Sequence, residues 1–444
     1  MKHLPGISLY EVFKNRKQIL KNPLPFHHEN FQKFGDSFRV KVGPGKSVVF
    51  TRDPALIRHI LQKQHKFYNK SPLQTRDLAK YIGHGILTSN GDHWRTHRRM
   101  VQPAFHKKKL AGLLTEMVNA IRCEVLRIQP DQTLDVFPLM GDLAFQVVSR
   151  TLFSRSDIKQ SMAKLKAITE ANQNMLIREM RQPYLKWWLR LSGQIREHVD
   201  LYGDACRLLN GIIEERIASG EEKDDLLDML LQARYEDGSP MSREQLIDEV
   251  LILFIAGHET TANAMSFTHF LLAKHPQAQE KAFEEASSID FEKGLQLEHL
   301  AKLGYITHCV EESMRLYPPA YYIDRNAIAH DHFKGMHIPK NTMILISLYE
   351  LHRYADFWED PNAFNPERFS ATTKKELSDY YYPFGAGPRM CVGNNFAMYE
   401  MIMTVALLLR NYKLSTEITS VEINPQISLK PLRVPIHFKV RTAV

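Results

Sequence analysis

The most informative segment of the sequence is Phe384-Gly-Ala-Gly-Pro-Arg-Met-Cys-Val-Gly393, which ends where a helical pattern begins at Asn394. Its glycines allow the backbone to turn tightly and to approach another group closely. The start of a helix lowers the pKa of a thiol and favours the thiolate, which is the form that binds metals. The segment therefore predicts that Cys391 is a metal ligand and not an inert packed residue. A phosphate-binding loop fits less well, because the dinucleotide pattern needs glycine where this chain has Met390.

The composition is that of an ordinary globular protein. Of the 444 residues, 44% are hydrophobic and 24% are charged, which excludes a disordered chain, a collagen and a disulfide-rich miniprotein. The 58 Lys and Arg residues exceed the 50 Asp and Glu residues, but they are scattered among acids, which argues against nucleic-acid binding. The longest basic run, residues 106–109, is typical of a solvated helix face and, less often, of a docking patch for an acidic partner. The four cysteines are too widely spaced for a zinc ribbon or a disulfide framework.

No segment of the sequence is long enough to span a membrane. The longest charge-free apolar stretches are residues 250–257 and 401–409, less than half of the ~20 residues that a bilayer requires. Residues 1–6 show neither the apolar core nor the cleavage site of a signal peptide. We therefore expect a cytoplasmic protein without a membrane anchor.

Helical patterns dominate, and no linker or repeat divides residues 1–444, which predicts one domain that is mainly α with small β-sheets at the two ends of the sequence. Residues 38–42 and 47–51 predict a hairpin around Gly43-Pro-Gly. The other expected elements are a helix over 55–64 capped by Asp53, mostly helices over 92–210, a long helix from a Ser242–Gln245 capping box to Pro276, strands within 327–347 and 414–440, and a helix over 394–412.

The segment Ala256-Gly-His-Glu-Thr-Thr261 lies midway along the long helix. A zinc-protease motif is excluded, because its second histidine would fall at Ala262. A glutamate and two threonines are poor core residues unless they meet water or a ligand. The segment therefore predicts a functional helix face, with a threonine bonded back to its own helix as the alternative.

The pattern Phe384-x-x-Gly387-x-Arg389-x-Cys391-x-Gly393 resembles the haem-binding signature of the cytochrome P-450 family. The resemblance implies the fold of that family, with a haem between a long central helix and the loop that carries the cysteine. Cys391 would be the axial thiolate of haem b and its metal ligand, with Phe384 packed on the same side. A thiolate pushes electron density onto the iron and favours cleavage of the O–O bond.

Further segments match this family in the expected order. Glu312-Ser-Met-Arg315 and the later Pro-Glu-Arg368 resemble its buried structural triad. Arginine forks its planar donors onto carboxylates, which suits the haem propionates. The positions that match haem-binding residues of the family are Trp94, Arg98, Ala256, Gly257, Arg325, Phe384, Arg389, Cys391 and Gly393.

The resemblance also implies that Glu259 and Thr260 are catalytic, as the acid and the alcohol of an oxygen-activation motif. Reduction of dioxygen needs two protons, and a hydroxyl backed by a carboxylate can relay them. Gly257 would let the helix bend and leave room for dioxygen.

The implied function is that of a soluble, bacterial-type haem-thiolate monooxygenase, which inserts one oxygen atom of O2 into a C–H bond and so hydroxylates or dealkylates a small organic substrate. No flavin or iron–sulfur module is expected in the chain. Electrons ultimately from NAD(P)H would then come from a ferredoxin with its reductase or from a flavoprotein. A net positive charge would suit an acidic donor. We expect a monomer that binds no nucleic acid.

The substrate pocket is expected to include residues 71–87, 172–192, 254–261, 321–323 and 427–429. Its candidate contacts are Phe254, Thr261, Tyr321, Tyr322 and Ile323. The residues of these motifs resemble those in the branches of the family that hydroxylate fatty acids, which favours a lipid-like substrate. Arg178, Arg181 and Lys186, together with the two tyrosines, would also suit a polar or anionic ligand, so oxidative O-demethylation of a methoxylated small molecule or sugar stays open.

Two other functions compete with the monooxygenase. A peroxygenase would place an arginine–carboxylate pair where this chain has Glu259-Thr260. A non-catalytic haem sensor would need no proton relay.

Overall fold

The computed structural model describes residues 4–43, 46–154, 159–291, 295–371 and 374–441. Residues 1–3, where no leader or anchor is expected, and residues 44–45 of the predicted hairpin turn lie outside these ranges. Within the described ranges, no helix is both long enough and apolar enough to cross a membrane.

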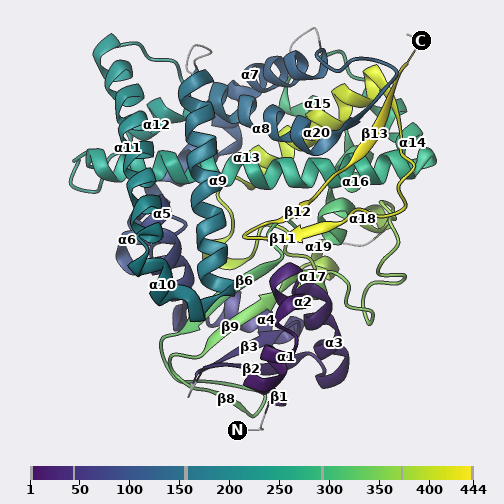
Figure 1. Cartoon of the computed structure of the whole chain (residues 1–444). Helices are drawn as coiled ribbons and strands as arrows, with labels where there is room; N and C mark the ends of the chain where they lie inside the picture. Colours follow the sequence, from purple (N-terminus) through teal and green to yellow (C-terminus); the bar gives the residue numbers. More distant parts are fainter. Residues whose placement is uncertain (1–3, 44–45, 155–158, 292–294, 372–373, 442–444) are drawn as a thin grey trace.

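Helices make up most of the described chain, and the strands are short (Figure 1). The α-helices are α1 (Leu9–Lys14), α2 (Arg16–Lys21), α3 (Leu24–Phe34), α4 (Pro54–Arg58), α5 (Ala79–Ile82), α6 (Gly91–Val101), α7 (Lys107–Val125), α8 (Val136–Phe153), α9 (Lys159–Arg181), α10 (Lys186–Leu191), α11 (Gln194–Ser219), α12 (Leu226–Gln232), α13 (Arg243–Lys274), α14 (Pro276–Ser287), α15 (Leu297–Ala301), α16 (Gly304–Leu316), α17 (Leu348–Leu351), α18 (Arg368–Ala371), α19 (Lys374–Leu377) and α20 (Asn394–Asn411). The strands are β1 (Gly6–Ile7), β2 (Ser37–Gly43), β3 (Lys46–Thr51), β4 (Tyr68–Asn69), β5 (Gln132–Asp135), β6 (Tyr322–Ala327), β7 (Asp331–Phe333), β8 (Met336–Ile338), β9 (Met343–Ser347), β10 (Tyr412–Ser415), β11 (Ile423–Pro425), β12 (Leu429–Pro431) and β13 (Pro435–Val440).

Helix α13 is the long helix that the sequence predicts, and it crosses the molecule with α8, α11, α16 and α20 packed against it (Figure 1). The Ser242 hydroxyl accepts a hydrogen bond from the Gln245 amide at 3.2 Å, which caps the first turn. The capping box is incomplete, because the Gln245 side chain donates to the His84 carbonyl and to Glu249 instead. Pro276 opens α14, so α13 ends where the sequence indicates.

The N-terminal hairpin shares one sheet with β6 and β9, within residues 322–347, while the C-terminal strands β10–β13 lie in other sheets. The strand order of the shared sheet is β1-β2-β3-β9-β6-β4. The predicted hairpin forms β2 and β3, and β3 then pairs in parallel with β9, nearly 300 residues later, from Val48 opposite Met343 to Thr51 opposite Ile346. Non-local pairing of this kind leaves no local sequence signal, because each strand alternates in the same way whichever partner it has.

Residues 92–210 are mostly helical, as the sequence predicts, with a short strand among the helices. They include strand β5, which pairs with β13 in a sheet of order β10-β13-β5. The predicted helix over 55–64 is α4 followed by a π-helical turn, η1 (His59–Lys63). Asp53 caps α4 as predicted, accepting from the amides of Ala55 and Leu56 at 2.9 and 3.1 Å.

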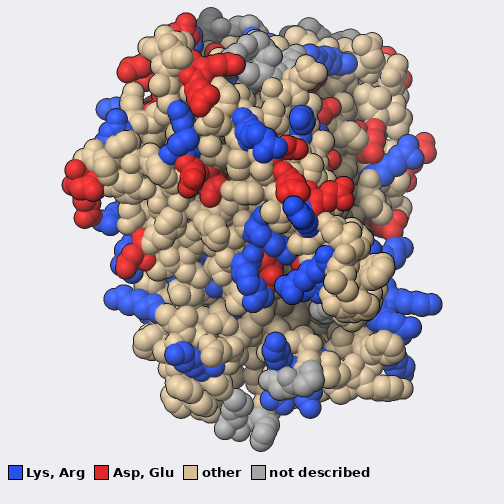
Figure 2. All heavy atoms as spheres, turned by 60° about the vertical axis from the view of Figure 1, so that its left-hand side comes forward, with Lys and Arg blue, Asp and Glu red and all other residues tan. Residues whose placement is uncertain are grey.

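The charges on the surface are less evenly mixed than those along the sequence. On the face shown in Figure 2, Lys and Arg side chains gather across the middle and the lower part, and Asp and Glu side chains lie mainly above them.

Candidate active site

The loop that carries Cys391 is shaped by two glycines with positive φ, Gly385 (+72°) and Gly387 (+70°). A Cβ atom on Gly387 would collide with the backbone carbonyl oxygen of Leu61 in η1. The Cys391 amide donates to the Phe384 carbonyl at 2.9 Å, which closes the loop just before Gly393 caps α20. The glycines therefore let the loop lie against η1 while Cys391 faces inward.

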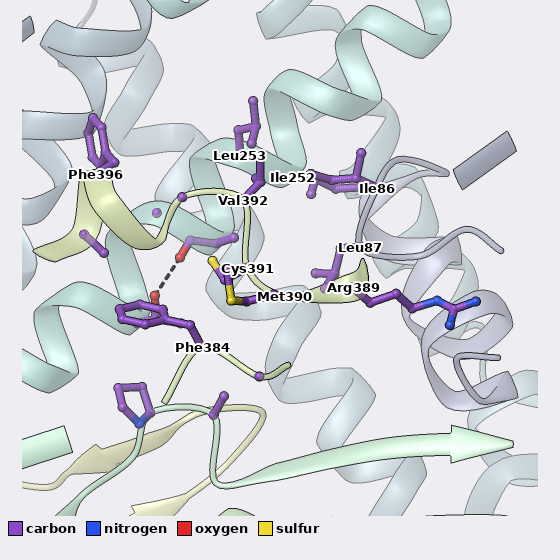
Figure 3. Close-up of a pocket in the computed structure, with 18 of the residues that line it drawn as sticks. Ile86, Leu87, Ile252, Leu253, Phe384, Arg389, Met390, Cys391, Val392 and Phe396 are labelled. Atoms are coloured by element: carbon purple, nitrogen blue, oxygen red, sulfur yellow. Dashed lines mark hydrogen bonds between the residues drawn. The ribbon is translucent and has the colours of Figure 1, made fainter. Parts of the chain in front are cut away.

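An internal cavity separates this loop from the middle of α13. Figure 3 shows Cys391 between Phe384 and Val392, with Ile252 and Leu253 of α13 beyond. Cys391 is exposed although protein surrounds it, because its accessible surface faces this cavity. Ala256 is exposed for the same reason, in the middle of a helix whose other faces are buried.

The sequence predicts a lowered thiol pKa for Cys391, and the structure reverses the direction. Burial raises the pKa of Cys391, and this outweighs the lowering by the Gly393 amide and by the Arg98 guanidinium. The buried thiol on its own therefore keeps its proton. A bound metal ion would displace that proton, since coordination deprotonates a thiol outright.

Both threonines of the α13 motif bond back to their own helix. Thr260 Oγ1 donates to the Ala256 carbonyl at 2.7 Å, and Thr261 Oγ1 donates to the Gly257 carbonyl at 2.8 Å. Both residues also line the cavity. A hydroxyl has one hydrogen and two lone pairs, so each threonine can still accept a hydrogen bond from a group in the cavity.

Gly257 has a packing role that differs from the predicted bend. Helix α13 is continuous from Arg243 to Lys274. A Cβ atom at position 257 would lie 3.1 Å from a methyl carbon of Val148 in α8. Glycine therefore lets α13 and α8 approach closely where the cavity begins.

Cationic side chains gather at one end of the cavity. Lys70, Arg325 and Arg389 all line it, and the first two are 7% and 6% exposed. Burial, with the neighbouring Arg325 and Arg389, lowers the pKa of Lys70 to about 7, and burial lowers the pKa of Arg325 to about 10. The Trp94 ring lies beside these cations, and its centre is 5.0 Å from the guanidinium carbon of Arg389.

Each of these three cations donates hydrogen bonds to the protein, but not all of their donor atoms have a partner. Lys70 donates to the carbonyls of Ile86 and Ser89, and Arg325 donates to the Asp324 carbonyl. Arg389 donates to the Tyr68 carbonyl and to Asn69, while its Nε is buried without a partner. A buried donor without a partner is costly. The cluster therefore fits an anionic group at this end of the cavity.

Arg98 is placed differently from the other predicted propionate ligands. It lines the cavity, but its Nη1 donates to the Met390 carbonyl at 2.8 Å and its Nε donates to Gln102 at 3.1 Å. Helix α6 is thereby tied directly to the cysteine loop.

The predicted structural triad is assembled around Arg315, and of its members Arg315 and Glu312 are fully buried. Arg315 and Glu312 form two parallel hydrogen bonds of 2.6 and 2.8 Å, and Arg368 Nε reaches Glu312 at 3.3 Å. The remaining Arg315 donors bind the carbonyls of His352, Pro361 and Ala363. Arg315 thus fixes the segment after α17 onto α16, behind the cavity.

The predicted substrate contacts divide into two groups. Thr261, Tyr322 and Ile323 line the cavity. Phe254 and Tyr321 are not among its lining residues. Phe254 is fully buried, and its ring packs against Phe145 and His258. The Tyr321 hydroxyl donates to the Gln426 carbonyl at 2.6 Å.

Glu259 is likewise absent from the cavity lining, and its Oε1 accepts a hydrogen bond from Ser428 at 2.7 Å. The sequence places Ser428 in an expected pocket segment, residues 427–429, without giving it a role, and sequence reasoning missed Lys70. A lone serine in a turn and a lone lysine before Ser71-Pro72 carry no pattern that marks them.

The sequence matches the family model described as Cytochrome P-450 over residues 4–438. The chain belongs to the cytochrome P-450 family. It is similar to a cytochrome P-450 of Trigonella foenum-graecum (30% identity over 94% of this chain and 82% of the relative) and to the 11-oxo-beta-amyrin 30-oxidase of Glycyrrhiza uralensis (30%, 92% and 79%). It is also similar to the cyclooctat-9-en-7-ol 5-monooxygenase of Streptomyces melanosporofaciens (29%, 89% and 86%).

Membership of the cytochrome P-450 family makes the protein a haem-dependent monooxygenase that uses O2 and a redox partner. The site fits a haem on its own chemistry: an inward thiol, a cavity between it and α13, and a cation cluster with an unpartnered buried donor.

Proposed function

We propose that this cytochrome P-450 inserts one oxygen atom of O2 into a C–H bond of an apolar, lipid-like substrate. The observation that carries the proposal is that the Cys391 thiol and the Thr260 hydroxyl open onto one cavity whose lining is mostly apolar. Its apolar side chains include Ile86, Leu87, Val148, Leu152, Ile252 and Leu253.

In this proposal the Cys391 thiolate would bind the haem iron, and Lys70, Arg325 and Arg389 would hold the haem propionates beside Trp94. Arg98 holds the cysteine loop in place through the Met390 carbonyl. When bound, the haem supplies the redox chemistry that activates O2. Thr260 accepts and donates a proton at Oγ1, and Glu259 supplies that proton from the next position along α13.

The competing anionic or sugar-like substrate is not favoured, because the basic side chains that suggested it are engaged elsewhere. Arg178 donates to Gln194, Arg181 donates to the carbonyls of Leu20 and Pro425, and Lys186 pairs with Asp77. The Tyr321 hydroxyl holds a turn. The two relatives with named substrates act on different compounds, so the cavity is the better guide to the substrate.

Titration with dodecanoic acid tests the substrate class. We expect a spin-state change of the haem on binding and hydroxylated product when NADH, a ferredoxin and its reductase are supplied. Methyl glucoside serves as the polar comparison. A spin-state change and formaldehyde release with the methyl glucoside, and neither response with dodecanoic acid, would reverse the assignment.

We propose a separate acidic ferredoxin or flavoprotein as the electron donor. Lys107, Lys108 and Lys109 are exposed at the start of α7. Two residues earlier, the Phe105 ring lies beside Gly393 in the cysteine loop. An acidic protein that docks on these lysines would lie close to the ligand side of the haem. We further propose that residues 1–444 form one haem domain, since β1–β3 share a sheet with β6 and β9.

A further inference from the structure

Glu259 is held at the surface of α13 by a chain of two hydrogen bonds. Asn263 Nδ2 donates to Ser428 Oγ at 2.9 Å, and Ser428 Oγ donates to Glu259 Oε1 at 2.7 Å. Asn263 is fully buried and Ser428 is 5% exposed. Asn263 lies one helical turn after Glu259, so both side chains are on the same face of α13.

The chemistry of these groups fixes the direction of the chain. A serine hydroxyl has a single hydrogen. Because the Asn263 amide occupies a lone pair of Ser428, the hydroxyl hydrogen is directed to Glu259 Oε1. Oε1 is therefore an acceptor, and a proton carried by this carboxyl must lie on Oε2.

Ser428 belongs to a turn that is attached to the wall of the cavity. The turn joins β11 to β12 and places Ser428 directly before β12. The Tyr321 hydroxyl donates to the Gln426 carbonyl at 2.6 Å, and the Leu429 amide donates to the Pro319 carbonyl at 2.9 Å. Pro319 itself lines the cavity. The position of the carboxyl is thereby tied to the segment that a bound substrate would touch.

We propose that Ser428 and Asn263 are positioning residues for proton delivery, which hold Glu259 in one orientation on α13 and link it to the cavity wall through the β11–β12 turn. This proposal rests on the proposed monooxygenase function. It explains why Asn263 and Ser428, two polar residues, are buried between α13 and this turn. It also assigns a role to Tyr321, which holds the turn in register.

The test compares Ser428→Ala with Ser428→Thr. Alanine removes the donor to Glu259 and threonine restores it. Ser266→Ala is the matched control, since the Ser266 hydroxyl is buried on the same helix and donates only to the Ala262 carbonyl of its own helix. Each haem-loaded variant is crystallised, and each is assayed with dodecanoic acid for hydroxylated product and for hydrogen peroxide per NADH consumed, in H2O and in D2O.

For Ser428→Ala we expect the Glu259 side chain to leave its wild-type position, with a ratio of product to peroxide about tenfold lower, as loss of one hydrogen bond predicts. We also expect a larger solvent isotope effect on product formation. Ser428→Thr and Ser266→Ala are expected to match the wild type in all three measurements.

A Glu259 carboxyl that keeps its position in Ser428→Ala, or an unchanged ratio of product to peroxide, would overturn the positioning role. The crystallographic comparison needs no turnover, so it decides the matter even if dodecanoic acid is not oxidised. Failure of the proposed function looks different: the wild type would then form no product from any tested substrate, whichever residue stands at 428.

Discussion

At the scale of single residues, the hydroxyl of Thr260 combines two roles that the sequence presents as alternatives. It bonds back to the Ala256 carbonyl and it faces the cavity. The bond to the helix uses the only hydrogen of the hydroxyl and leaves its lone pairs free. Toward the cavity the hydroxyl is therefore an acceptor, and it must rotate or exchange its proton before it can donate there.

Thr260→Ala is expected to separate electron consumption from product formation. The variant keeps the fold and consumes NADH, but the ratio of product to hydrogen peroxide falls by about tenfold or more, because a general acid–base group is lost. Thr260→Ser retains the hydroxyl and is expected to stay close to the wild type. Unchanged coupling in the alanine variant would remove Thr260 from proton delivery.

Lys70 predicts a pH dependence of haem retention. In the haem-free site the pKa of Lys70 is about 7, lowered by burial and by Arg325 and Arg389, with Glu249 and Asp324 acting in the opposite direction. A propionate beside Lys70 restores the ammonium form, so above pH 7 haem binding takes up a proton. The affinity for haem therefore falls as pH rises from 7 to 9, by at most about tenfold per pH unit for one proton.

Haem transfer to apomyoglobin measures this effect. We expect the rate of haem loss to rise with pH in the wild type, and Lys70→Met to lose haem faster at pH 7 and to depend less on pH. An equal pH dependence in both proteins would show that Lys70 does not face a propionate.

At the scale of elements, the cysteine loop and η1 meet at Gly387, whose φ of +70° and contact with the Leu61 carbonyl leave no space for a side chain. Gly387→Ala is expected to lower the free energy of unfolding by about 1–3 kcal/mol through backbone strain and to reduce haem content. Gly112→Ala is the control, because this glycine lies within α7 with open space around it, and there alanine is expected to stabilise the helix by about 0.5–1 kcal/mol. Thermal unfolding of both variants measures the difference. Equal melting temperatures would contradict the close approach.

The elements that could be predicted from sequence are those with local signals. Asp53, Ser242 and Pro276 mark helix ends by their own chemistry, and the boundaries of α4, α13 and α14 follow them. The joining of β3 to β9 and of β5 to β13 depends on partners hundreds of residues away, and it was not predictable. The same holds for the site. The cysteine loop and the α13 motif are contiguous patterns, whereas Ser428 and Lys70 reach the site from segments without any pattern.

The predicted lowering of the Cys391 pKa is wrong for a related reason. The helix end and Arg98 lower the pKa of Cys391 as the sequence suggests, but the depth of burial outweighs them. Burial at this position is a property of the assembled fold, to which α13, α20 and the cysteine loop all contribute.

At the scale of the whole molecule, the exposed lysines at the start of α7 predict where an electron donor docks. Changing Lys107 and Lys109 to Glu is expected to slow reduction by an acidic ferredoxin about tenfold at low salt and to weaken the salt dependence, because steering by charge is screened by salt. Lys17→Glu, in the exposed part of α2 far from α7, is the control and should behave like the wild type (Figure 1). Stopped-flow reduction measures the rate. Equal slowing by both changes would indicate an effect of net charge and not of a docking site.

The proposed chemistry depends on the Cys391 thiolate, which would bind the haem iron. The most direct test is the carbon monoxide difference spectrum of the reduced protein, recorded for the wild type and for Cys391→His. The wild type is expected to show the strongly red-shifted Soret band of a thiolate-ligated haem, and the histidine variant is expected to lose it. A wild-type band at the position of a histidine-ligated haem, in freshly prepared folded protein, would show that the Cys391 thiolate does not bind the haem iron.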